Sequence, residues 1–132
     1  MKTYALRLHP GEDLKVRLDA FAVSNHLQAA CVLACVGSLS KAVLRNADQS
    51  EPSILLGKYE IVALTGVLSE HGSHYHIAIA DGEGRTFGAH LLDGCRVYTT
   101  AEIVLLDLED HVFLRTYDEQ TGYLELEIIN LP

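Results

Sequence analysis

Three features are missing from this sequence: a disulfide framework, a long apolar run and a surplus of basic residues. The cysteines are Cys31, Cys35 and Cys95, an odd number without a Cys-x-x-Cys pair, set in apolar runs. Such cysteines indicate buried, reduced thiols and argue against a scaffold held by disulfides. No stretch reaches the roughly 20 apolar residues of a membrane span, and residues 1–13 lack the apolar centre of a signal peptide. We therefore expect a cytoplasmic protein that does not cross a membrane.

The shortage of basic residues limits the choice of partners. Lys and Arg number 10 against 18 Asp and Glu, for a formal net charge of −8, and the basic residues are scattered along the chain. A nucleic-acid duplex or an anionic membrane is repelled by this charge unless a local basic patch overrides it. The composition thus disfavours direct nucleic-acid binding.

What the sequence does contain is a pattern of β-strands in a chain of one-domain size. With 132 residues, 48% of them hydrophobic, it can bury a core, and we expect residues 1–132 to form a single compact domain. From Glu12 the apolar residues follow helical spacing, with acidic residues in the first turn. The patterns predict an α+β fold: a largely antiparallel sheet, curled toward a barrel, and one main helix. The expected strands cover residues 3–9, 29–36, 39–45, 57–69, 73–80, 85–92, 95–108, 112–117 and 123–129, and the helix ends near residues 24–26.

One of these strand-like stretches, Ala29–Val36, has no polar residue. Such a run predicts a strand that is covered on both faces. Gly37 interrupts it, which indicates either a bulge or the close approach of another backbone segment.

Residues 72–91 are the most informative stretch and have the pattern of a β-hairpin. The turn signal Asp81-Gly82-Glu83-Gly84 separates two alternating segments. Only a three-residue loop, residues 82–84, places the apolar residues of both strands on one face. That register sets four pairs opposite each other: Phe87 and Ile79, Ala89 and Ile77, Leu91 and Tyr75, and His90 and His76.

The same register gathers three histidines on the other face of the hairpin. Facing residues have Cβ atoms roughly 5 Å apart and diagonal neighbours roughly 7–8 Å, so His74, His76 and His90 can converge on one ion. Neutral imidazoles suit zinc, and three of them plus an open position form the usual catalytic type of zinc shell. Small residues at positions 78, 80 and 88 leave room for a water, a ligand or another subunit. We predict a metal site here; the alternative is that the histidines line a solvated sheet face or a subunit interface.

Three further residues are candidates for supporting roles. His71 fits either a fourth ligand or a loop residue, and the loop is favoured. Glu70 and Glu102 are candidates for a carboxylate that orients a histidine or acts as a general base. Glu102 is the candidate catalytic residue because it interrupts an apolar strand, but it fits an edge-strand charge or a salt bridge to Arg45 or Arg7 equally well.

Several segments, taken in order, resemble the PPC family, the plants-and-prokaryotes-conserved domain. The similarity covers almost the full chain. It is carried by Arg7 with Pro10-Gly11, by Gly37-Ser38-Leu39-Ser40, by GKYEIVALTG at residues 57–66, by HYHIAIADGEGRTFGAHL at residues 74–91 and by TTAEIVL at residues 99–105. One departure is Ala89, which stands where the family usually has the second of two glycines before the histidine.

The resemblance implies a compact fold that assembles as a homotrimer. In prokaryotic members the histidines that match His74, His76 and His90 are candidate metal ligands. Plant members lack these histidines and carry a basic AT-hook that binds the DNA minor groove, and this chain has no such hook. By analogy with the plant members, a DNA-binding or regulatory module is the alternative function.

The leading hypothesis is a cytoplasmic homotrimer with zinc or a similar divalent metal at the three histidines, near a cleft or a subunit boundary. It would act on or sense a small molecule; in an enzyme, zinc would lower the pKa of a bound water to roughly 7. A third hypothesis is a scaffold or small-ligand sensor in which the metal only clips the trimer together. The residues leave these hypotheses open.

Overall fold

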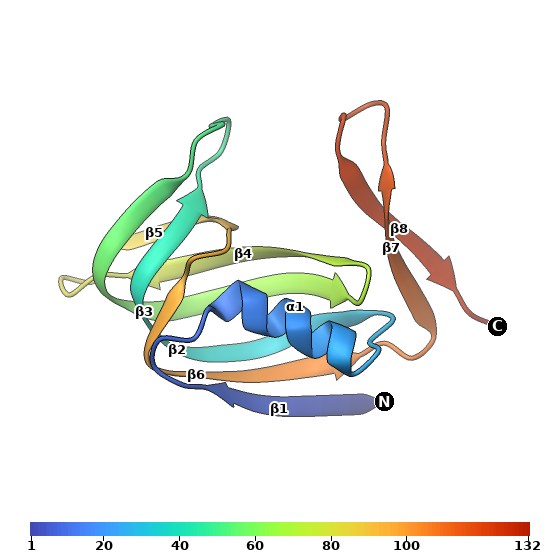
Figure 1. Ribbon diagram of the computed structural model, residues 1–132, viewed down its shortest axis with the longest axis horizontal. Helices are drawn as coiled ribbons and strands as arrows, with labels where there is room; N and C mark the ends of the chain where they lie inside the picture. The colour runs from blue at the N-terminus through green and yellow to red at the C-terminus, as the bar shows by residue number, and fades with distance from the viewer.

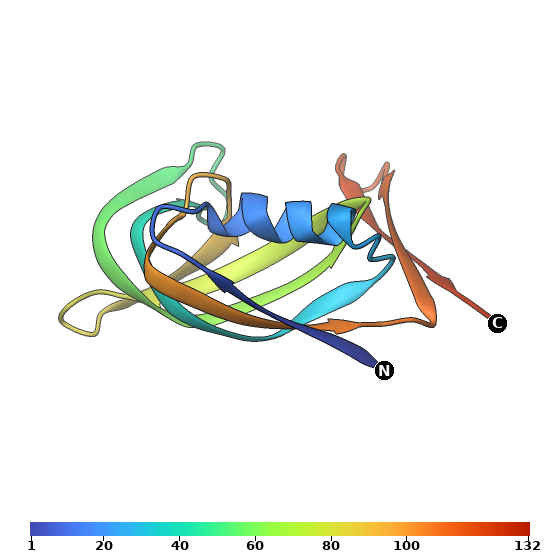
Figure 2. The ribbon, with the colours of Figure 1, turned by 60° about the horizontal axis from the view of Figure 1, so that its bottom comes forward.

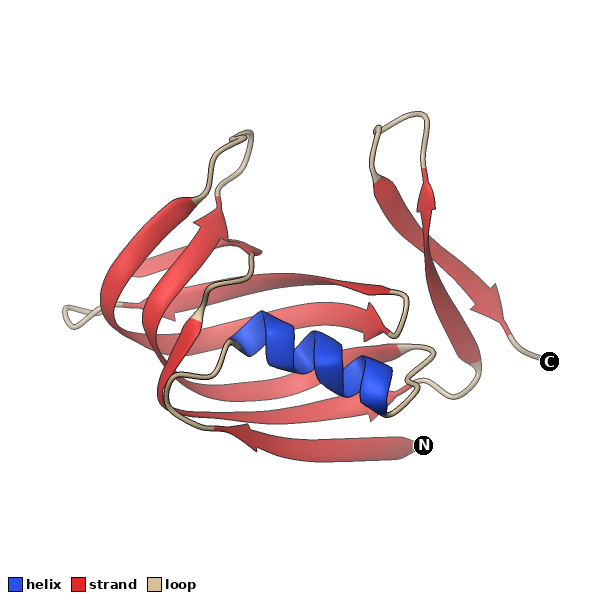
Figure 3. Cartoon of the chain, viewed as in Figure 1, coloured by secondary structure: helices blue, strands red, loops and turns tan.

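The computed structural model describes residues 1–132 and contains one helix and eight strands (Figure 1 and Figure 3). The elements are β1 Lys2–Leu8, α1 Leu14–Ser24, β2 Ala30–Arg45, β3 Ser53–Ser69, β4 Gly72–Ala80, β5 Thr86–Leu91, β6 Arg96–Asp107, β7 His111–Tyr117 and β8 Leu124–Asn130. Six strands form an antiparallel sheet in the order β1-β6-β2-β3-β4-β5, and β7 pairs with β8 alone. The predicted α+β fold with one helix is confirmed.

The sheet curls because its longest strands bend and share several neighbours. β2 has 16 residues and β3 has 17, and both contain register shifts. β2 pairs with β6 and β3, and its end also pairs with β5, where Leu44 is opposite Leu91 and Arg45 is opposite His90. Figure 2 shows the sheet wrapped beneath α1. The predicted curl therefore brings the end of β2 beside the histidine hairpin.

α1 begins directly after Asp13, whose side chain caps it. The Asp13 carboxylate accepts a hydrogen bond from the Val16 amide at 3.1 Å and one from the Gly94 amide at 2.7 Å, which ties the helix to the turn before β6. The prediction of acidic residues in the first turn was wrong, because Glu12 and the capping Asp13 both precede it. No helix here is long and apolar enough to cross a membrane. Three apolar side chains of α1 are buried: Leu14, Leu18 and Ala22.

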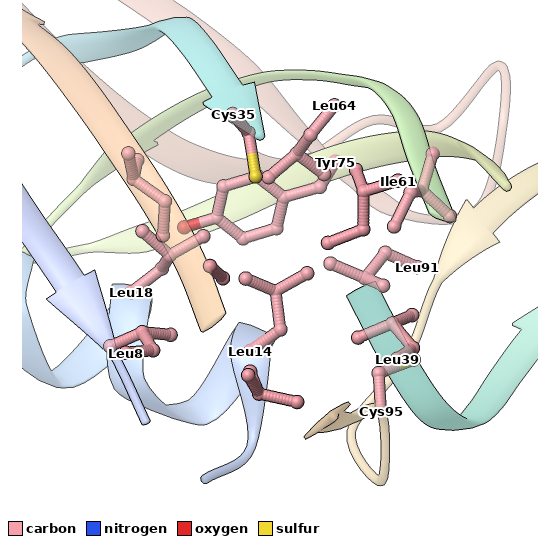
Figure 4. Packing of buried hydrophobic residues seen from close by; sticks show 14 of the residues in the cluster. Leu8, Leu14, Leu18, Cys35, Leu39, Ile61, Leu64, Tyr75, Leu91 and Cys95 are labelled. Carbon is pink, nitrogen blue, oxygen red and sulfur yellow. The ribbon is translucent and has the colours of Figure 1, made fainter. Parts of the chain in front are cut away.

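One cluster of buried side chains lies between α1 and the concave face of the sheet (Figure 4). Tyr75 of β4 is fully buried in it, and its hydroxyl donates a hydrogen bond to Asp19 Oδ1 of α1 at 3.0 Å. Residues 77 and 79 of β4 are buried too. Because strand side chains alternate, His74 and His76 point to the opposite face, which we call the outer face of the sheet. All three cysteines are free thiols.

The prediction that the apolar start of β2 is covered on both faces was wrong for a single chain. Leu33 and Val36 of β2 are 55% and 65% exposed, and Val62 of β3 is 57% exposed. The reason is that α1 covers only the concave face of the sheet. Exposed apolar surface of this kind is typical of an interaction site.

β7 and β8 form a hairpin that stands apart from the main sheet (Figure 1). Residues 111–117 pair with residues 124–130, as predicted for the closing strands. At the base of the hairpin, Ser69 Oγ donates a hydrogen bond to the carbonyl of Phe113 at 2.7 Å. The rest of the hairpin exposes large apolar side chains: Tyr117, Tyr123, Leu124, Ile128 and Ile129.

Gly37 has both features that its sequence position indicated. The pairing with β6 shifts register after it, and a Cβ atom here would overlap the carbonyl oxygen of Thr100 and lie 2.7 Å from the Cα of Ala101. Gly37→Ala is expected to lower the free energy of unfolding by about 1–3 kcal/mol, because the β6 backbone has to move. Urea denaturation measures the loss. Gly82→Ala is the control, since nothing lies within 4 Å of a Cβ there; an equal loss in both variants would rule out close packing as the cause.

Candidate metal centre

The hairpin of β4 and β5 has the register that was predicted from its loop. The Asp81 amide donates a hydrogen bond to the carbonyl of Arg85 at 2.9 Å and thereby closes the three-residue loop. This tight connection sets which side chains meet across the two strands. The pairs are His76 with His90, Ile77 with Ala89, Ala78 with Gly88, Ile79 with Phe87 and Ala80 with Thr86. The fourth predicted pair, Tyr75 with Leu91, is not part of this ladder, because Leu91 pairs with Leu44 of β2.

The three imidazole rings gather on the outer face. The ring centroid of His74 lies 4.8 Å from that of His76 and 5.0 Å from that of His90, and the other two centroids are 5.7 Å apart. One nitrogen of each ring lies within 4.8 Å of the others, and the Nε2 atoms of His74 and His76 are 3.1 Å apart. Two nitrogens bound to one tetrahedral zinc at about 2.0–2.1 Å are roughly 3.3 Å apart. The donor set therefore fits a divalent ion after small side-chain rotations.

Burial favours the neutral form of two of these imidazoles. It lowers the pKa of His90 to about 4, and the positive charge of Arg45 acts in the same direction. The pKa of His74 is lowered by burial and next by His76. A metal-bound histidine must be neutral, so side chains that resist protonation are suited to hold an ion at neutral pH.

The histidines line a cavity of about 1040 Å³. Its alanine and glycine residues are at positions 47, 63, 78, 88 and 89. Of the three positions predicted to leave room, 78 and 88 line the cavity and 80 does not. The β2–β3 loop, residues 46–50, adds a polar wall, and Arg45 and Tyr123 complete the lining. Sequence reasoning missed this wall. Arg45 reaches the histidines through the β2–β5 pairing and Tyr123 through the placement of the β7–β8 hairpin, and neither contact has a local sequence signal.

Two of the other candidates, Glu70 and His71, lie in a separate cluster at the turn between β3 and β4. The Gln28 side chain donates a hydrogen bond to Glu70 Oε1, which is the main reason for the lowered pKa of Glu70, and His26 Nδ1 lies 3.2 Å from Glu70 Oε2. His71 Nε2 is 3.4 Å from the side-chain oxygen of Gln28. The structure places His71 in the turn and joins neither residue to the three histidines.

The structure does not bring Glu102 to the histidines within one chain. It lies on β6, opposite Arg7 of β1 and Val36 of β2, and both β2 and β3 separate it from β4. No salt bridge joins it to either arginine that was considered; Arg7 Nε instead donates a hydrogen bond to Thr100 Oγ1 at 3.0 Å. A catalytic role for Glu102 stays a prediction that requires a neighbouring subunit.

A comparison with known families identifies the domain. The model of the Plants and Prokaryotes Conserved domain, abbreviated PCC or PPC, matches residues 1–109, which contain β4, β5 and all three histidines. The chain belongs to this family. The β7–β8 hairpin of this PPC protein lies beyond the matched residues.

Solved structures share the PPC fold over almost the whole chain. A hypothetical protein from Salmonella enterica is 40% identical with a TM-score of 0.94, over 98% of this chain and 94% of that one. A metal-containing protein from Archaeoglobus fulgidus is 28% identical with a TM-score of 0.82, over 96% and 94% of the two chains. A Bacteroides thetaiotaomicron protein, described as a candidate DNA-binding protein, is 21% identical with a TM-score of 0.84, over 95% and 91%; that likeness shows the fold alone.

Two curated relatives contain this domain as one part of a longer chain. A protein named bifunctional protein GlmU in a Synechococcus strain is 54% identical over 128 residues, which is 97% of this chain. The same-named protein of a second strain is 52% identical over 128 residues. The PPC protein spans about a fifth of the length of these relatives, 21% and 20%.

Proposed function

We propose that this PPC protein is a cytoplasmic homotrimer that holds a divalent metal ion, zinc by preference, at His74, His76 and His90. We propose further that it acts on or senses a small molecule in the adjoining cavity. The observation that carries the proposal is the convergence of three imidazole nitrogens within 4.8 Å of one another on the wall of a cavity. The metal-containing relative from Archaeoglobus fulgidus supports it.

The donor set favours zinc in an open rather than a closed site. Neutral imidazoles suit zinc, and three protein ligands leave a position for water or a ligand, whereas structural zinc sites use four. When bound, zinc would supply a Lewis acid and a water with a pKa of roughly 7. No carboxylate belongs to the histidine group, so Glu102 is the catalytic candidate only if another subunit brings it to the cavity.

The homotrimer is the assembly that the family resemblance implies, and an uncovered apolar patch on the outer face offers a surface for the contact between its subunits. Val36 and Val62 are exposed there, on neighbouring strands, each one residue from the Gly37–Ile61 pair. Ala63, which follows Val62, lines the histidine cavity. A second copy that covers this patch would therefore sit at the edge of the cavity, which supports a site near a subunit boundary.

DNA binding is the competing function, and the charge of the chain argues against it. A protein with this fold is described as a candidate DNA-binding protein, but the present chain carries a net charge of −8. Affinity for a duplex comes mainly from clustered Lys and Arg that displace counterions. In a fluorescence anisotropy titration we expect no tight binding. Tight binding to a DNA duplex that weakens steeply with salt would favour DNA binding over the proposed small-molecule function.

The metal content of the purified protein tests the proposed site. The protein is prepared without a histidine-containing tag, and elemental mass spectrometry is applied to a sizing-column peak of measured mass. About one zinc or similar ion per chain supports the proposal. A folded protein that takes up no metal even after incubation with zinc would contradict it, and would leave the histidines as interface or ligand-contact residues.

A further inference from the structure

We propose that Arg45 is the anion-binding residue of the three-histidine cavity, so that the molecule recognised there carries an oxyanion group, a carboxylate or a phosphate. This inference rests on the proposed metal site and names the ligand class for it. It follows from the position of Arg45, from its lack of a protein partner and from the balance of charges in the cavity.

Arg45 lies at the end of β2, directly beside the histidines. It is opposite His90 in the β2–β5 pairing and lines the same cavity. No other Lys or Arg lines the cavity, so Arg45 is its only fixed positive charge.

The Arg45 guanidinium is free to bind a ligand. It forms no ion pair or hydrogen bond with the chain, whereas Arg17 pairs with Glu12 at 3.2 Å and Arg85 with Asp81 at 2.9 Å. A guanidinium offers planar N–H donors that match a carboxylate or a phosphate in bidentate fashion. An oxyanion is therefore the group that this side chain is suited to hold.

The charges around the histidines favour an anion once an ion is bound. The donor set consists of three imidazoles and no carboxylate, so no protein carboxylate would offset the charge of a divalent ion there. Asp48 is the one carboxylate in the lining; it forms no ion pair with Arg45, and its formal charge is equal and opposite to that of Arg45. The loaded cavity is thus positive on a chain of net charge −8, which directs an anion to this place.

The cavity also has room and polar groups for the rest of the molecule. Its volume of about 1040 Å³ greatly exceeds that of a single oxyanion. In the β2–β3 loop, Asn46 already donates to Ser53 Oγ at 3.1 Å, while the side chains of Gln49 and Ser50 have no partner within the chain. These groups fit the body of a small organic acid or a phosphorylated small molecule.

The test is an anion titration of the cobalt-loaded protein. The visible absorption of bound cobalt reports on its surroundings, and the probes are acetate, methylphosphonate and, as a neutral counterpart, acetamide. Metal content is measured for each variant. We expect Arg45→Gln to keep its metal and to weaken anion binding by roughly 10- to 100-fold, since a hydrogen-bonded charge is lost. Arg17→Gln, which removes the same charge from α1, should leave the affinity unchanged.

The outcomes distinguish a failure of the metal site from a failure of the anion-binding role of Arg45. A preference for acetate identifies a carboxylate ligand and a preference for methylphosphonate a phosphate ligand, and either supports the role of Arg45 if its loss weakens binding. Two results would overturn the role of Arg45 and leave the metal site standing. In the first, the metal-loaded protein binds neither anion; in the second, the Arg45→Gln variant binds the anions as tightly as the unchanged protein does. Protein that takes up no metal overturns the metal site and this inference with it.

Discussion

His76→Ala is expected to lower the bound metal from about one ion per chain to almost none in protein purified at neutral pH. His76 neighbours both other members of the group: it is opposite His90 across the hairpin, and its Nε2 atom is 3.1 Å from that of His74. Without it, two imidazoles remain, and the loss of affinity should exceed the roughly 10- to 100-fold caused by removing an outer-shell partner. Equilibrium dialysis against zinc, followed by elemental analysis, measures the change.

His71→Ala is the matched control for this variant. It removes the same side chain from the turn that precedes β4, where His71 lies beside Gln28. The control should keep its metal; if it loses metal as His76→Ala does, His71 is a fourth ligand. Normal metal binding by His76→Ala would contradict the three-histidine site. Loss of the trimer together with the metal would instead favour the hypothesis that the ion only clips the subunits.

The histidine cluster could be predicted because its geometry depends on local pattern. The loop at residues 82–84 and the alternation of the two strands determine the register, and the register determines that His76 meets His90. No long-range information is needed for that step. Gly37 was predictable in part: a glycine after an apolar run indicates a bulge or the close approach of another segment, but only the fold shows that this segment is β6.

The rest of the cavity could not be predicted because it depends on contacts between distant segments. Arg45 meets His90 only because β2 is long enough to reach β5 as well as β3 and β6. Tyr123 lines the cavity only through the placement of a hairpin that pairs with nothing but itself. The error at the start of β2 has a similar cause. An apolar run predicts that both faces of the strand are covered, but it does not show whether the cover comes from the same chain or from another one.

The exposed apolar residues of the outer face indicate where two subunits would contact each other. Val62 lies at a register shift of β3 between Ile61, which is buried, and Ala63, which lines the cavity. A carboxylate at position 62 would be placed in the proposed contact between subunits, where burial of an unpaired charge is strongly unfavourable. Within a single chain the same carboxylate would simply face water.

Val62→Glu is therefore expected to convert the proposed trimer to monomers. This is a threefold fall in mass to the 14.5 kDa of one chain, measured by sizing with light scattering. Val23→Glu is the matched control, because Val23 of α1 is 53% exposed against 57% for Val62 and receives the same substitution away from the outer face. The monomer should still bind about one ion per chain, since all three proposed ligands belong to one hairpin. An unchanged mass for Val62→Glu would place the subunit contact elsewhere, and metal lost together with the trimer would show that the site needs a second subunit.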